Sequence, residues 1–144
     1  MIVNLTFRER SLWLLLLSLT VTFGFYFASV LPMQLTNVTP SHVMTFIGTL
    51  ILLVIIQIIG NAILAIARRR ELAGKVQNDE RDVLINLKST RLAFYVLSVG
   101  VFCSLCIALL VPGNFFFVHV LLAFWVLAQV IEILSQLILY RFGV

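Results

Sequence analysis

Four long apolar stretches dominate this chain of 144 residues. They run over Ser11–Leu31, His42–Ala67, Leu92–Val111 and Phe115–Tyr140, and only the last contains a charged residue, Glu132. A bilayer core about 30 Å thick is crossed by about 20 helical residues. The runs are continuous rather than alternating every second residue, which favours helices over strands. The sequence therefore predicts an all-α integral membrane four-helix bundle that forms one domain, residues 1–144.

Composition argues against two other classes of protein. The chain is 62% hydrophobic and 11% charged, whereas a soluble domain carries about 25% charged residues. Much of the apolar surface must therefore face lipid. The net charge of +4 does not indicate nucleic-acid binding, because no stretch combines basic residues with interleaved aromatics.

The ten Lys and Arg residues predict the orientation. Two precede the first stretch, seven lie between Arg68 and Arg91, and the last is Arg141. The connections Pro32–Ser41 and Pro112–Asn114 contain none. Because positively charged loops stay in the cytoplasm, both termini and a loop over residues 68–78 are predicted to be cytoplasmic. The expected location is the inner membrane of a bacterium.

The third helix is predicted to begin before it enters lipid. Asn78 or Asp79 is placed to cap it, and Glu80 and Asp82 suit the positive end of its dipole. We therefore expect a helix over residues 79–111, with its membrane part from Leu92.

The two halves of the chain resemble each other. Gln57 aligns with Glu132 and Asn61 with Gln136. In the preceding helices, the residues Arg8, Leu12, Leu17, Ser18 and Pro32 align with Lys88, Leu92, Leu97, Ser98 and Pro112. Two hairpins that both start in the cytoplasm would form a parallel repeat, with its axis along the membrane normal. Chance matching of apolar sequence is the alternative.

Glu132 is the most informative polar residue. A carboxylate in hydrocarbon is costly, so we expect it to face the bundle interior or to be protonated. Gln129 and Gln136 share its helix face, and Gln57 and Asn61 lie at a comparable depth. These five groups are expected to meet in the cytoplasmic half. They either form hydrogen bonds that fix helix packing, or bind a proton, a cation or another ligand such as a quinone or lipid head group.

A metal site is a weaker hypothesis. His42 and His119 lie near the outer ends of their helices, and Cys103 and Cys106 are one turn apart in the outer half of the third. Two thiols and two imidazoles could bind Zn²⁺ or Cu⁺. However, cysteine is common in apolar cores, and the sequence predicts no metal and no cofactor.

A stripe of small residues lies on the third helix and consists of Gly100, Ser104 and Ala108. Small residues at this spacing let helices approach closely in membranes. The stripe could serve the bundle itself or the seam of a homodimer.

A short motif carries a family resemblance. The run Asp79–Asp82, followed by Ile85, Tyr95 and Leu97, resembles a family of bacterial four-helix inner-membrane proteins with a D-E-R-D motif before the third helix. Residues 6–13 also resemble its N-terminal pattern. The resemblance implies the topology and a bacterial source, and implies no chemistry. Members often carry an acidic residue in the second helix where this chain has Gln57, which puts any two-carboxylate mechanism in doubt.

No set of residues typical of a soluble enzyme is present in the sequence. The leading hypothesis is therefore a non-enzymatic accessory or regulatory subunit that acts through partners, either a second copy of itself or another membrane protein. The alternative is a small proton- or cation-coupled transporter or channel that uses Glu132. A metal or redox protein is the third and weakest class.

Overall fold

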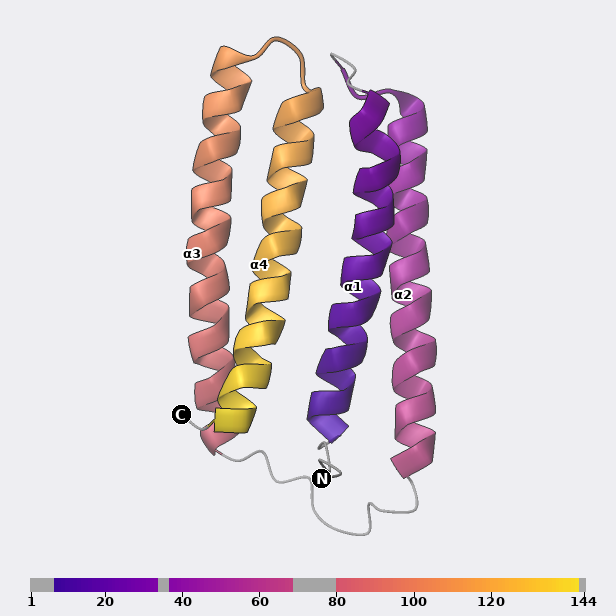
Figure 1. Cartoon of the computed structure of the whole chain (residues 1–144), viewed down its shortest axis with the longest axis vertical. Helices are drawn as coiled ribbons and strands as arrows, with labels where there is room; N and C mark the ends of the chain where they lie inside the picture. The colour runs from indigo at the N-terminus through magenta and orange to yellow at the C-terminus, as the bar shows by residue number, and fades with distance from the viewer. Residues whose placement is uncertain (1–6, 34–36, 69–79, 143–144) are drawn as a thin grey trace.

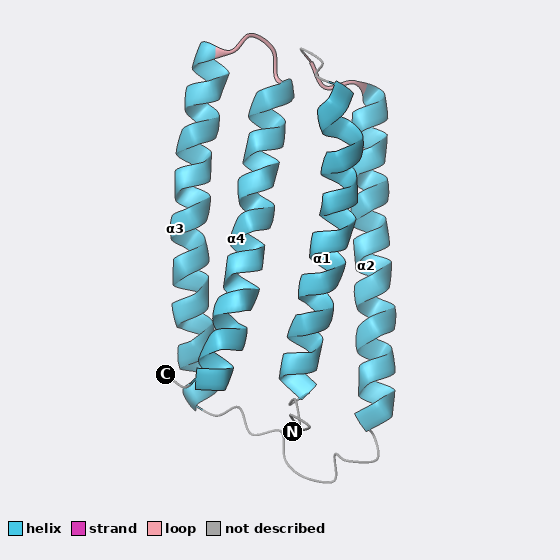
Figure 2. Cartoon of the chain, in the orientation of Figure 1, coloured by secondary structure: helices cyan, strands magenta, loops and turns pink. Residues whose placement is uncertain are grey.

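The structure is a computed structural model that describes residues 7–33, 37–68 and 80–142. These residues form the helices α1 (Phe7–Val30), α2 (Pro40–Arg68), α3 (Glu80–Leu110) and α4 (Phe115–Phe142), with a short 3₁₀ helix, Leu31–Met33, after α1 (Figure 2). All four α-helices are long and apolar enough to cross a membrane. This confirms the all-α prediction of four such helices. The predicted cap at Asn78 or Asp79 and the loop from residue 69 lie outside the described residues.

The helices run antiparallel in the spatial order α3, α4, α1, α2 (Figure 1). The start of α1 and the end of α4 lie at one end of the molecule, and the connection from α3 to α4 lies at the other. Backbone contacts join α1 to α2, α1 to α4 and α3 to α4, and within the described ranges none joins α2 to α3 or α4. The bundle is therefore two hairpins packed along α1 and α4, and it is open between α2 and α3.

The connection between α3 and α4 is tight because its residues favour a turn. Pro112 cannot continue a helix, since it lacks the backbone N–H. Gly113 has φ of 89°, a left-handed conformation that is inexpensive only for glycine. Asn114 then precedes the first residue of α4 and accepts a hydrogen bond from the backbone N–H of Val38 over 2.8 Å. This bond links the segment before α2 to the connection between α3 and α4.

The buried apolar residues lie mainly between α1 and α4. One cluster contains Leu16, Ile133 and Leu137, and the other contains Tyr26, Val30 and Phe115. By contrast, the most apolar part of α2 has no buried residue. Exposed apolar side chains on this scale fit a surface that faces lipid or a partner helix.

The small-residue stripe of α3 serves the contact with α4. Gly100 and Ser104 are buried, whereas Ala108 is exposed. A Cβ atom at Gly100 would overlap the side chain of Phe124, so only glycine permits this approach. Ser104 donates its hydroxyl to the carbonyl oxygen of Gly100 over 2.7 Å, so this buried hydroxyl is paired within its own helix. Two of the three stripe residues thus act inside the fold.

Candidate functional site: polar groups within the helices

Three hydrogen bonds between side chains join α3 to α4 in a regular ladder. The hydroxyl of Tyr140 donates to Asp82 Oδ1 over 2.9 Å, Gln136 Nε2 donates to Asn86 Oδ1 over 3.2 Å, and the hydroxyl of Thr90 donates to Glu132 Oε1 over 2.7 Å. The partners recur every four residues in opposite directions along the two helices. Residues four apart share one helix face, so an antiparallel pair brings all three rungs into register.

A second set of hydrogen bonds joins α1 to α2. Gln57 Nε2 donates to the hydroxyl oxygen of Ser18, and Ser18 in turn donates to the carbonyl oxygen of Leu15 over 3.0 Å. The hydroxyl of Ser11 donates to Asn61 Oδ1 over 2.7 Å, while Asn61 Nδ2 donates to the carbonyl oxygen of Gln57 over 2.9 Å. The two amides of α2 therefore bind hydroxyls of the neighbouring helix.

The five predicted polar residues are thus not brought together in one cluster. Glu132 and Gln136 bond to α3, whereas Gln57 and Asn61 bond to α1. The physical reason is the arrangement of the helices. Both α2 and α4 pack against α1, but they make no backbone contact with each other. The polar groups are shared between two hairpins rather than gathered around one central site.

Gln129 differs from the other four. It is half-buried on α4, three residues before Glu132, and its amide makes no hydrogen bond with any residue in the described ranges. A polar group in hydrocarbon without a partner costs several kcal/mol. An amide at this depth therefore favours an external partner, either water or a polar group of another molecule.

The two hairpins form similar hydrogen bonds between their helices, but the bonded residues are not at equivalent positions of the sequence alignment. In each, the pair at positions 57 and 61 or 132 and 136 bonds to the preceding helix of its own hairpin. The sequence alignment, however, matches Ser18 with Ser98, whereas Glu132 bonds to Thr90. The repeat stays a prediction, supported by the equivalent roles of the aligned residues in the second helices.

The two histidines meet near the starts of α2 and α4. Their ring centroids are 6.2 Å apart, and both rings contact Phe115. His119 Nδ1 lies 2.7 Å from the carbonyl oxygen of Phe115, and its Nε2 lies 3.1 Å from the Tyr26 hydroxyl. A carbonyl only accepts, so in neutral His119 the proton is on Nδ1 and Nε2 accepts from Tyr26.

His42 has a structural role at the start of α2. Its Nδ1 accepts a hydrogen bond from the backbone N–H of Thr39 over 3.2 Å, as the Glu or Gln of a capping box does. In neutral His42 the proton is then on Nε2, which is buried and has no partner in the described part of the chain. The ring lines a cavity of about 120 Å³ with Tyr26, Phe46 and His119.

This arrangement does not suit a metal ion. Metal binding at His42 Nε2 would require the proton on Nδ1, where His42 instead accepts the N–H of Thr39. Cys103 and Cys106 are half-buried free thiols on α3, and α3 makes no backbone contact with α2, which carries His42. No group of three or more His, Cys, Asp or Glu residues that could hold a metal occurs in the described ranges.

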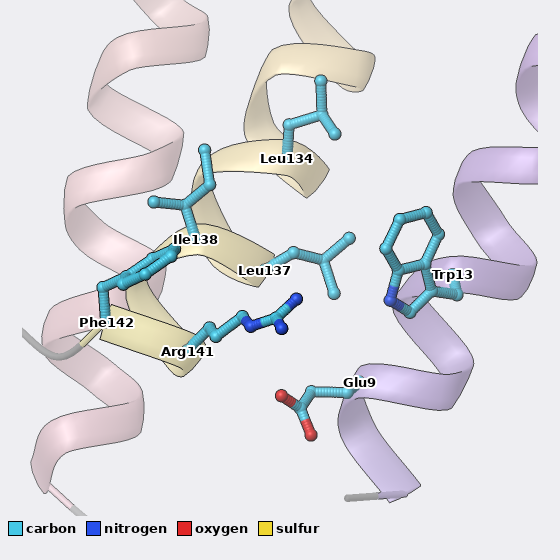
Figure 3. A pocket seen from close by; sticks show the side chains of 7 residues that line it. All are labelled: Glu9, Trp13, Leu134, Leu137, Ile138, Arg141 and Phe142. Carbon is cyan, nitrogen blue, oxygen red and sulfur yellow. The ribbon is translucent and has the colours of Figure 1, made fainter. Parts of the chain in front are cut away.

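An apolar groove of about 220 Å³ lies at the end of the molecule where α1 begins and α4 ends. Figure 3 shows Glu9 and Arg141 pointing toward one another across it. The rest of the lining is Trp13, Leu134, Leu137, Ile138 and Phe142. In the predicted orientation this end faces the cytoplasm.

Comparison with protein-family models, curated proteins and solved structures gave no match. The resemblance to the D-E-R-D family stays a prediction, and Asp79 of that motif lies outside the described residues.

The hydrogen-bond partners of the predicted polar residues are not among the residues that the sequence singles out for the polar site. They are the hydroxyl and amide groups Ser11, Ser18, Asn86 and Thr90. A signal was available, because Asp82, Asn86 and Thr90 recur every four residues before the membrane part of the third helix. That spacing is typical of one polar helix face.

Proposed function

We propose that this chain is a non-enzymatic membrane protein that acts by binding another membrane protein, or a second copy of itself, as an accessory or regulatory subunit. The observation that carries the proposal is which polar side chains of the apolar helices have a hydrogen-bond partner within the described residues. Gln57, Asn61, Glu132 and Gln136 are hydrogen-bonded within the two hairpins, whereas Gln129 has no partner in the described ranges. Polar side chains commonly join transmembrane helices by hydrogen bonds.

The open arrangement of the helices supports the same proposal. Within the described ranges α4 makes backbone contacts with α1 and α3 and none with α2, so part of its surface stays open to another transmembrane helix. The proposed contact surface is the face of α4 that bears Gln129. A partner with a hydroxyl or amide at the same depth would complete its hydrogen bonding.

The proposed location is the inner membrane of a bacterium, with both termini in the cytoplasm. The proposal rests on the ten basic residues, which all lie on one predicted side. A green fluorescent protein fused after Val144 should fluoresce, and alkaline phosphatase fused there should be inactive. Phosphatase inserted at Gly113 should be active, and the opposite pattern would overturn the orientation.

Photo-cross-linking tests the proposed binding role. A photoreactive amino acid is placed at Gln129 and, as a matched control, at Leu109, which is 87% exposed on α3. In native membranes, position 129 should give a discrete protein adduct, whereas position 109 should give lipid adducts. Substitution of Glu132 by Gln should leave the adduct in place. The same smear of lipid adducts at both positions would overturn the proposal.

A transporter that uses Glu132 is the second candidate, and one observation favours it. Glu132 is half-buried, and only its Oε1 atom bonds to another residue in the described ranges. The second carboxylate oxygen could receive a proton or a cation. The two candidates differ in their response to Glu132→Gln, because an amide preserves the hydrogen bond with Thr90 but cannot exchange a proton.

A further inference from the structure

The groove between the first turns of α1 and the last turns of α4 combines two kinds of surface. Its mouth carries one acidic and one basic side chain, Glu9 and Arg141, which face one another (Figure 3). Its walls are apolar over most of their area, and they are formed by Leu134, Leu137, Ile138, Phe142 and Trp13. A matching ligand must therefore have a zwitterionic head and an apolar body.

The position of the groove restricts the ligand to a membrane lipid. Along α4 the lining extends from Leu134 to Phe142, a span of about 12 Å by helical rise. The charges thus lie at the end of the span and the apolar walls extend inward from them. Trp13, 43% exposed, lies beside Glu9 in the lining, where indole rings favour the level of the head groups.

Helix dipoles explain only part of this arrangement. Glu9 is in the first turn of α1 and Arg141 in the last turn of α4, so each charge complements the dipole of its own helix. The dipoles do not explain why the two side chains point toward one another across an apolar groove. Attraction between the opposite charges orients the two side chains toward one another, and a bound group that carries both signs would pair with each of them.

We propose that this groove binds a phospholipid with an ethanolamine head group. The Arg141 guanidinium binds the phosphate, the Glu9 carboxylate accepts hydrogen bonds from the ammonium group, and one acyl chain follows Leu134 and Ile138. A choline head group offers Glu9 no N–H donor. A glycerol head group carries the same phosphate but has no positive charge to pair with Glu9. The groove therefore selects ethanolamine lipids, and this selection does not depend on the proposed protein partner.

Native mass spectrometry of the purified, delipidated protein tests the proposal. The protein is titrated with phosphatidylethanolamine, phosphatidylcholine and phosphatidylglycerol with identical acyl chains. Wild-type protein should bind the ethanolamine lipid about ten-fold more tightly than the other two, as expected for a charge-assisted hydrogen bond. Arg141→Gln should weaken binding of all three lipids, and Glu9→Gln should abolish the preference while the protein still binds lipid.

Matched variants separate this site from general effects of charge. Lys88→Gln and Glu80→Gln make the same charge changes on α3, outside the groove lining, and should leave the preference intact. Ile138→Trp fills the groove without changing either charge and should also abolish it. Helical content by circular dichroism confirms that each variant is folded. Equal affinity of wild type for the three lipids, or a preference that survives Glu9→Gln, would overturn the proposal.

Discussion

Thr90 on α3 donates its hydroxyl to Glu132 Oε1 on α4 over 2.7 Å. This bond is the innermost of three rungs that also include Asn86 with Gln136 and Asp82 with Tyr140. Glu132 is the one charged residue in its apolar stretch, and its neighbour across the interface supplies a donor. The simplest role that this geometry gives Glu132 is to join two helices.

The close approach of α3 and α4 makes Gly100 sensitive to substitution. A Cβ atom there would overlap Cβ and Cγ of Phe124, which are near the backbone and cannot rotate away. We expect Gly100→Ala to lower the free energy of unfolding by about 1–3 kcal/mol, the cost of overpacking. Reversible unfolding in mixed micelles measures the change.

Gly24 and Gly48 provide matched controls for that substitution. At both positions an added Cβ atom would meet no other side chain within 4 Å, and both residues are exposed. Alanine at either position should leave stability unchanged or raise it by up to about 1 kcal/mol, because alanine favours a helix interior. Equal losses at positions 24 and 100 would contradict the packing of α3 against α4.

His42 should be replaceable by glutamine but not by alanine. Glutamine at this position can accept the N–H of Thr39, as in a capping box. Alanine loses that bond, worth about 0.5–2 kcal/mol, together with the ring contacts to Phe115 and His119. Thermal unfolding of the purified variants should therefore rank wild type and His42→Gln above His42→Ala. A similar loss in both variants would argue against the capping role.

Proteoliposomes test the transporter alternative. If Glu132 joins helices, a pH gradient should produce no more proton flux with wild-type protein than with Glu132→Gln, because the substitution removes only the exchangeable proton. A pH-sensitive dye inside the vesicles measures the flux. Flux in wild type that Glu132→Gln abolishes would favour the transporter.

Much of the fold was predictable from hydrophobic length. The limits of α1 to α4 lie within a few residues of the expected helices, because a membrane span is set by apolar length. The sequence also singles out Gln57, Asn61, Glu132 and Gln136 as polar residues within apolar helices, since polar groups are rare and costly in hydrocarbon.

The grouping of those residues was not predictable. Hydropathy gives each helix its length and depth but not its neighbours, so Gln57 and Glu132 were placed together although they belong to different hairpins. The role of the histidines was likewise not predictable from hydropathy. The sequence placed His42 and His119 at a similar level, but the cap made by His42 depends on the local turn at Thr39.

A double-mutant cycle between Thr90 and Glu132 tests the packing role most directly. The free energies of unfolding of wild type, Thr90→Val, Glu132→Leu and the double variant give the coupling between the two side chains. We predict a favourable coupling of about 0.6–1.7 kcal/mol, the range for hydrogen bonds between transmembrane helices. A coupling of zero would show that Glu132 does not hold α3 and α4 together and would contradict the packing role.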